Sequence, residues 1–192
     1  EENSSRSPLE KFYTQVKAGD FSQENYFFQT EVGTFNAEIT QNTVTLKFIL
    51  TQDTFYQYAP LLLDFSDLWQ QQYGLYGYGR AEREYLHSNV KNLTKRTFES
   101  HFEQEKLAKY KNSQGEILVD CSQFPGCDLY YEDLLFTSCW LMYVSKEYEK
   151  VVPKEIFLEA QEVEKIQYFS NSPQKTIKTM LFKDPYKEEA PR

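Results

Sequence analysis

The sequence predicts an α+β fold, with an N-terminal helix, a mainly antiparallel β-sheet and helices packed on one face of that sheet. Three stretches of the chain carry this prediction. Residues 8–18 repeat apolar side chains at helical spacing, whereas residues 43–50 (TVTLKFIL) alternate them with polar ones, as a half-buried strand does. Residues 129–144 are the most apolar stretch, and their aromatic content is typical of core strands.

The predicted N-terminal helix has both start and stop signals. Ser7 is a candidate N-cap that forms a capping box with Glu10, and Pro8 suits the first helical turn. Gly19 follows Ala18 directly, in the position where glycine commonly ends a helix. We therefore expect the first helix to run from about Pro8 to Ala18.

Later elements follow from similar patterns. Residues 81–111 favour helix with a break near Asn92, and residues 116–120 (EILVD) are typical of a short strand. The segment KTIKTMLF, residues 175–182, predicts a last strand. The helices would then lie against a sheet built from residues 30–50, residues 116–144 and this last strand.

The length and composition indicate one folded domain. A chain of 192 residues with 40% hydrophobic and 17% aromatic residues has enough apolar area for a core. No repeat or low-complexity tract marks a domain boundary. We expect a flexible N-terminus over residues 1–6, a single α+β domain over residues 7–182 and a flexible C-terminal tail over residues 183–192.

The net charge of -8 argues against nucleic-acid partners, because nonspecific affinity for nucleic acids depends on cationic side chains that neutralise phosphates. The same argument applies to anionic lipid surfaces. No apolar run reaches the roughly 18 residues that a membrane-spanning helix needs. We therefore expect neither nucleic-acid binding nor membrane insertion.

The three cysteines allow two alternatives. Cys121 and Cys127 flank a turn containing Pro125 and Gly126, and a disulfide across it would contribute roughly 2 kcal/mol of stability. In that case Cys139 is a buried free thiol, and we expect a secreted, periplasmic or cell-surface protein. The alternative is three free thiols in the cytoplasm.

No motif fixes a reaction. The chain has no HExxH, GxSxG, GxxxxGK[ST] or CxxC sequence. His87 and His101 would lie about 21 Å apart on one continuous helix, too far to share a metal ion. Asp64 and Asp67 lie among aromatic residues, as carboxylates do in sugar-binding clefts, but carboxylates also occur commonly at helix starts. We therefore expect no catalytic residues, metal site or cofactor.

The most informative segment is the aromatic run from Phe55 to Arg80. We expect its first half, through about Trp69, to belong to the core and to contain a short helix at residues 67–73. The sequence GLYGYG then predicts a loop, because repeated glycine disfavours helices and central strands. Aromatic side chains on such a loop are typical of a contact surface. The candidate binding residues are Trp69, Tyr73, Tyr76, Tyr78 and Arg80.

These observations favour a non-enzymatic, exported binding domain that contacts a protein or carbohydrate partner through its Tyr/Gly-rich loop. Two further hypotheses stay open. The aromatic residues could line the cavity of a small-molecule carrier, or dispersed residues could form the active site of a hydrolase. The sequence does not identify the ligand under any of the three.

Overall fold

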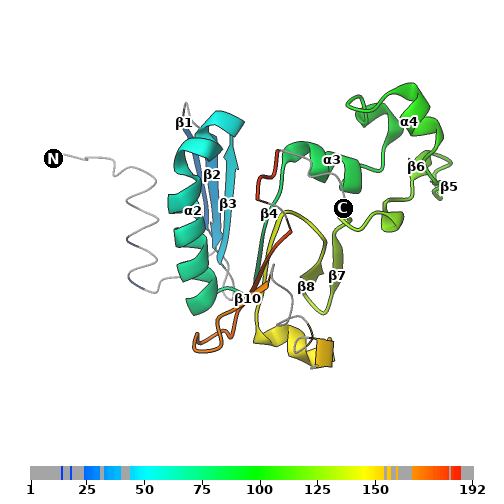
Figure 1. Ribbon diagram of the computed structural model, residues 1–192. Helices are drawn as coiled ribbons and strands as arrows, with labels where there is room; N and C mark the ends of the chain where they lie inside the picture. The colour runs from blue at the N-terminus through cyan, green and yellow to red at the C-terminus, as the bar shows by residue number, and fades with distance from the viewer. Residues whose placement is uncertain are drawn as a thin grey trace. The chain divides into compact units, whose positions relative to one another are not determined.

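The computed structural model describes Thr14, Ala18 and residues 24–30, 33–39, 44–153, 155, 156, 159, 166–181 and 183–186. Over these residues the fold is mixed α+β, with three α-helices of defined bounds and several small antiparallel sheets (Figure 1). The chain divides into two compact units, Glu1–Leu63 and Asp64–Arg192.

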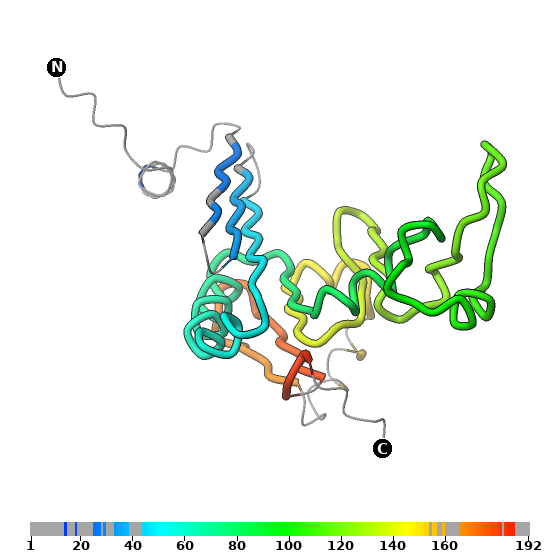
Figure 2. Tube along the Cα trace, turned by 90° about the horizontal axis from the view of Figure 1, so that it is seen from above, coloured from blue at the N-terminus to red at the C-terminus, as the bar shows by residue number. Residues whose placement is uncertain are grey.

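The first unit contains a three-stranded antiparallel sheet (Figure 2), made of β1 (Glu24–Thr30), β2 (Gly33–Ile39) and β3 (Val44–Leu50). Its register places Tyr26 opposite Ala37, which in turn lies opposite Leu46. Tyr26 and Ala37 are buried, and Leu46 packs against them.

Strand β3 confirms the strand predicted for TVTLKFIL, but burial alternates only from Val44 to Lys47, and Phe48, which shares a face with Leu46, is exposed. The helix predicted from Pro8 to Ala18 lies outside the described residues, except for Thr14 and Ala18, which are helical. The first helix with described bounds follows this sheet instead of preceding it.

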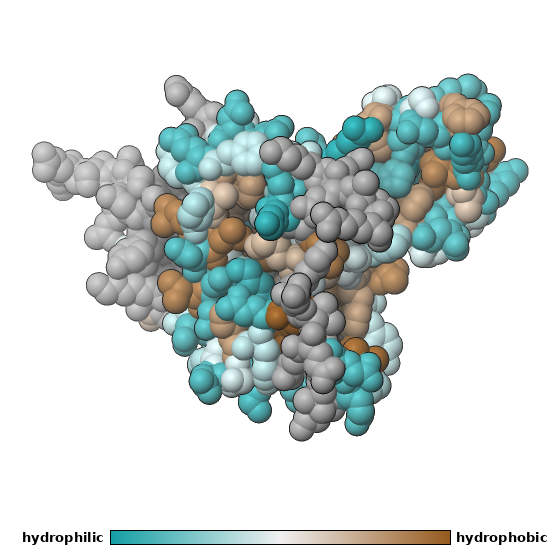
Figure 3. Space-filling view, in the orientation of Figure 1, coloured by the Kyte–Doolittle hydropathy of each residue, from teal (hydrophilic) through white to brown (hydrophobic). Residues whose placement is uncertain are grey.

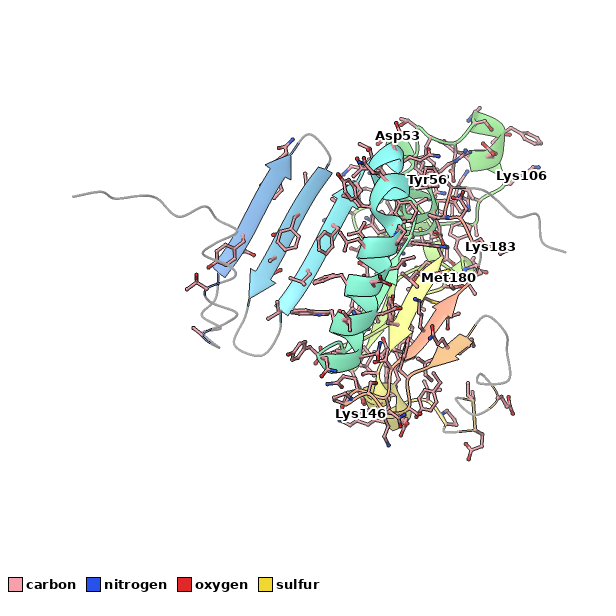
Figure 4. All side chains as sticks on the ribbon, turned by 60° about the vertical axis from the view of Figure 1, so that its left-hand side comes forward. Asp53, Tyr56, Lys106, Lys146, Met180 and Lys183 are labelled. Atoms are coloured by element: carbon pink, nitrogen blue, oxygen red, sulfur yellow. The ribbon has the colours of Figure 1, made fainter. Side chains whose placement is uncertain are left out.

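That helix, α2 (Gln52–Gln72), is three times longer than the helix predicted at residues 67–73. The backbone N–H of Thr54 donates to the Thr51 hydroxyl, which caps the first turn. Asp53 in the same turn places a carboxylate near the positive end of the helix dipole (Figure 4). The helix continues through Pro60, although an internal proline normally removes a backbone hydrogen bond.

The prediction that the first half of the aromatic run is core was wrong. In α2, every residue of which is described, only Thr54 is buried. Leu61, Phe65 and Leu68 are exposed, and Trp69 is half-buried. Apolar residues at the surface are visible as brown atoms in Figure 3.

The second unit contains a four-stranded antiparallel sheet in the order β10-β11-β9-β4. Its strands are β4 (Tyr76–Gly79), β9 (Leu141–Val144), β10 (Ile166–Tyr168) and β11 (Ile177–Met180). Leu141 and Tyr143 of β9 are buried, as is Ile177 of β11. Strand β4 is therefore an edge strand whose single partner, β9, belongs to the core.

Two small hairpins complete the sheets of this unit. They are β5 (Lys109–Lys111) with β6 (Ile117–Val119), and β7 (Leu129–Tyr131) with β8 (Leu134–Phe136). The shorter helices are α3 (Glu82–Asn89) and α4 (His101–Glu105), with the 3-10 turns η1 (Leu93–Lys95), η2 (Cys121–Gln123) and η3 (Lys146–Lys150). The described strands thus form four separate small sheets, where we had expected one main sheet.

The end of α2 that belongs to the second unit is tied to the four-stranded sheet. The Tyr143 hydroxyl donates to one carboxylate oxygen of Asp67 at 2.6 Å, and the Lys178 ammonium donates to the other at 2.8 Å. The hydroxyl of Thr176 donates to the backbone carbonyl of Gln70. Asp67 is thus neither a helix-start residue nor a free carboxylate of a sugar site. It anchors the helix to β9 and β11.

A fully buried arginine organises the segment after α3. The Arg96 guanidinium donates to the backbone carbonyls of His87 and Val90 and to both carboxylate oxygens of Glu99. The Gln104 side chain in turn donates to the Arg96 carbonyl at 2.7 Å. One side chain therefore satisfies carbonyls at the end of α3 and joins this helix to the segment before α4.

Candidate functional site

The last four residues of the GLYGYG segment form strand β4, where a loop was predicted, whereas Gly74 and Leu75 lie outside the strand. Its glycines serve close packing, since a Cβ at Gly79 would lie 3.3 Å from the Trp140 ring and one at Gly77 would collide with the Gln70 side chain. Alternate residues of a strand point to opposite faces, so Tyr76 and Tyr78 lie on the face away from these contacts. Strand β4 thus packs its glycine face inward and presents its tyrosines on the other.

Arg80, which follows β4, is buried rather than exposed as a contact residue. Its side chain is 6% exposed and makes two hydrogen bonds with Asp128, of 2.8 and 2.6 Å. Burial opposes the charged form, but Asp128 outweighs this effect and raises the pKa of Arg80. The guanidinium carbon lies 4.6 Å from the ring centre of Tyr78 and 4.7 Å from that of Tyr85. Arg80 therefore positions two tyrosine rings.

A fourth ring comes from strand β7. Tyr130 lies near Tyr76, since each of the two side chains influences the pKa of the other. Tyr78, Tyr85 and Tyr130 are 46%, 45% and 65% exposed, which leaves much of each ring in solvent. We call Tyr76, Tyr78, Tyr85 and Tyr130 the tyrosine cluster.

Burial raises the pKa values of three members of this cluster, Tyr76, Tyr78 and Tyr130. Their hydroxyls are therefore uncharged at neutral pH. Each one can both donate and accept a hydrogen bond. The cluster thus combines apolar ring area with neutral polar groups.

The hairpin that supplies Tyr130 was not predicted. Glu132 and Asp133 both have positive φ angles, of 48° and 64°, as in a type I′ turn. This tight turn reverses the chain so that β8 is largely buried while all of β7 is exposed. The Asp at the turn was the one local signal, because Asp tolerates positive φ better than most residues.

The remaining predicted contact residues, Trp69 and Tyr73, belong to a different surface. They lie one turn apart at the end of α2, with ring centres 5.3 Å apart, and Phe65 continues the row at 6.1 Å from Trp69. The structure therefore brings together Tyr76, Tyr78 and Arg80 but places Trp69 and Tyr73 in a separate aromatic row. Tyr85 and Tyr130 were missed, because only the tertiary fold brings them to β4.

Cys121 and Cys127 are both buried and share one cluster with Val119. Burial raises the pKa values of both thiols. Both side chains belong to this cluster, on either side of the turn at Pro125 and Gly126. Their disulfide stays a prediction.

We expect the chain isolated from its natural source without reductant to show one free thiol after denaturation and three after reduction. Cys139 should be the free one, because burial raises its pKa to about 12 and keeps it protonated. Differential alkylation followed by mass spectrometry measures this directly. Three free thiols before reduction would contradict both the disulfide and the expected export.

A ring nitrogen of each histidine lies close to a carboxylate. Nδ1 of His87 lies 2.8 Å from Glu99, and Nε2 of His101 lies 3.3 Å from Glu105. Over the residues that the structure describes, no group of three or more His, Cys, Asp or Glu side chains is placed to hold a metal ion. Within the same residues, no helix combines the length and the apolar character needed to cross a membrane. Comparison of the chain with protein-family models, curated proteins and solved structures found no match.

Proposed function

We propose that the protein is a non-enzymatic interaction domain that binds a protein partner through the tyrosine cluster. The observation that carries this proposal is the arrangement around Arg80, whose buried ion pair with Asp128 fixes the rings of Tyr78 and Tyr85 while both stay half exposed. Burying an arginine–carboxylate pair carries a desolvation penalty. A binding role of the rings that this pair positions explains why the protein tolerates the penalty.

Tyrosine suits this role for physical reasons. Each ring supplies a large contact area with few rotatable bonds, so little conformational entropy is lost on binding. Its hydroxyl finds a hydrogen-bond partner at the rim of the interface. Rings that are already fixed before binding lower the entropic cost further, which favours affinity.

A protein partner is favoured over a carbohydrate because the cluster lies beside the backbone of an edge strand, β4. Backbone groups of an edge strand pair readily with another polypeptide. The hydrolase hypothesis draws no support from the predicted residues, because Asp67 is paired with Lys178 and His87 with Glu99. The test below also detects carbohydrate binding, which would replace the protein partner.

The test compares two triple variants of the full chain with the wild type, using a phage-displayed random-peptide library and a glycan array as probes. The cluster variant carries Tyr78→Ser, Tyr85→Ser and Tyr130→Ser. The control variant carries Tyr58→Ser, Tyr110→Ser and Tyr186→Ser, which replaces three exposed tyrosines elsewhere. It loses the same number of rings but leaves the cluster intact.

We expect peptides selected on the wild type to bind the control variant equally well and the cluster variant about tenfold or more weakly, a loss of roughly 1.4 kcal/mol or more. Titration calorimetry measures both affinities, and thermal unfolding checks that each variant is folded. Binding of glycans alone would replace the protein partner with a carbohydrate. Selected peptides that bind the cluster variant as tightly as the wild type would overturn the proposal, as would the absence of any selected ligand.

A further inference from the structure

We infer that the free edge of β4 receives an extended segment of the partner as an added β-strand, which pairs with the backbone of Tyr78. This inference rests on the proposed function and specifies the form of its partner. The inference follows from the direction in which the backbone groups of β4 point and from the hydrogen bond that Gln70 makes to this edge. It also follows from the position of the tyrosine cluster beside the edge.

The hydrogen bond just before β4 shows which residues of this strand form backbone hydrogen bonds with β9. The N–H of Ser145 donates to the carbonyl of Leu75 at 3.2 Å, directly across from it in the register of β4 and β9. In an antiparallel ladder, directly opposed pairs alternate between hydrogen-bonded and non-hydrogen-bonded. Gly77 and Gly79 therefore bond toward β9, and the backbone groups of Tyr76 and Tyr78 point away from it.

The pairing of β9 with β11, on the side away from β4, agrees with this assignment of hydrogen bonds. The N–H of Leu181 donates to the carbonyl of Trp140 at 2.9 Å, which continues the register of β11 and β9. By the same alternation, Met142 and Val144 bond toward β11. Their backbone groups are therefore not available to Tyr78 and Tyr76, which lie opposite them in β4.

One of the backbone groups of β4 that point away from β9 already has a hydrogen-bond partner from a side chain. The Gln70 amide donates to the carbonyl of Tyr76 at 3.3 Å, where the N–H of a neighbouring strand would otherwise donate. Neither the N–H nor the carbonyl of Tyr78 has a hydrogen-bond partner among the described residues. The edge thus offers a donor and an acceptor at Tyr78, the pair that an added antiparallel strand uses.

Within the part of the chain that the structure describes, the edge also lacks the usual protection against strand addition. Native edge strands are commonly blocked by a charged side chain, a proline or a bulge. Strand β4 has the sequence YGYG and pairs with β9 without interruption. Its open backbone favours an extended polypeptide, because only a polypeptide repeats amide donors and carbonyl acceptors at the strand spacing.

The tyrosine cluster defines the side chains that this segment carries. A residue directly opposite Tyr78 points to the same face as Tyr78, and the residue two positions along lies opposite Tyr76. Both would contact the cluster, so we expect apolar side chains at these two positions. The residue between them points to the glycine face, where Gly77 leaves the Gln70 side chain close to the backbone.

The first experiment uses the peptides selected on the wild-type chain and two variants of one residue. Tyr78→Ala removes the ring and keeps the N–H, whereas Tyr78→Pro removes both. Proline is tolerated where an edge-strand N–H points outward, so β4 can still pair with β9. We expect the proline variant to bind the peptides about tenfold more weakly than the alanine variant, because it loses one backbone hydrogen bond to the added strand.

The second experiment leaves the protein unchanged. Peptides methylated at one backbone nitrogen at a time should lose affinity at alternate positions, because alternate amides of an added strand face β4. Amide hydrogen exchange at Tyr78 should slow about tenfold or more in the complex, consistent with a new hydrogen bond. The N–H of Gly77 should be protected with and without peptide.

The outcomes separate this inference from the proposed function. Equal affinity of Tyr78→Ala and Tyr78→Pro, together with no alternation in the methylated peptides, would overturn strand addition. The proposed function would still hold if the cluster variant lost affinity. A dimer that forms through β4 without peptide, and that Tyr78→Pro abolishes, would make a second copy the occupant and would also overturn a partner segment.

Discussion

Replacing Glu99 with Gln should lower the free energy of unfolding by about 3 to 5 kcal/mol, because it leaves the Arg96 charge buried without its counter-charge. Arg96 is fully buried, and the Glu99 side chain is nearly so. Urea unfolding followed by circular dichroism measures the change. The carbonyls of His87 and Val90, which Arg96 also binds, cannot neutralise the charge.

The control for this variant is Glu105→Gln. Glu105 is paired with His101 on the surface, where both side chains are largely exposed. Exposed pairs contribute little, so we expect a change of about 0.5 kcal/mol or less. Equal effects of the two substitutions would show that the buried pair does not stabilise the segment after α3.

The same pair predicts the pH dependence of stability. Burial alone would raise the pKa of Glu99, but hydrogen bonds and charge from Arg96 and His87 outweigh it and lower the pKa. A carboxylate whose pKa is lower in the folded state stabilises the fold above its unfolded pKa, and this contribution is lost as the pH falls through the folded pKa. Unfolding of the wild type in acid should therefore show a loss of stability that Glu99→Gln lacks.

Asp128→Asn should have the second largest effect, because it changes both stability and binding. It removes the counter-charge of the buried Arg80 guanidinium, and we expect a loss of about 2 to 3 kcal/mol, since Asp128 is partly exposed. The rings of Tyr78 and Tyr85 should then lose their fixed positions, and peptides selected on the wild type should bind more weakly, although the proposed interface uses the rings and not Asp128.

Arg80→Lys separates the two parts of this effect. Lysine keeps the positive charge but lacks the planar group that binds a carboxylate through two hydrogen bonds and stacks on aromatic rings. We expect this variant to retain more stability than Asp128→Asn while losing a similar part of its peptide affinity. Full peptide affinity in both variants, measured by titration calorimetry below their unfolding temperatures, would show that Arg80 does not position the rings.

Local patterns predicted some elements correctly. Strand β3 follows from its alternation alone, because the register of a half-buried strand is set by which residues face the core. The glycine-rich segment misled the prediction, since repeated glycine usually indicates a loop. Here Gly77 faces the Gln70 side chain and Gly79 faces the Trp140 ring, and Trp140 is distant from Gly79 in the sequence.

The candidate site could be predicted only in part, for the same reason. Tyr76 and Tyr78 were found because they are close together in an unusual segment. Arg80 was found too, but its role was assigned incorrectly, because its partner Asp128 is 48 residues away. Tyr85 and Tyr130 come to the cluster through that ion pair and through a tight hairpin. The ion pair leaves no local pattern in the sequence, and the hairpin leaves only the Asp at its turn.

The position of Trp140 against Gly79 gives β4 an optical reporter. The chain has two tryptophans, and Trp69 lies half-buried on α2, whereas Trp140 is buried beside the edge strand. With Trp69 replaced by phenylalanine, the remaining indole emission would come from a site next to Gly79 of the proposed docking strand. Binding at this edge could then be followed in real time by the fluorescence of the unlabelled protein.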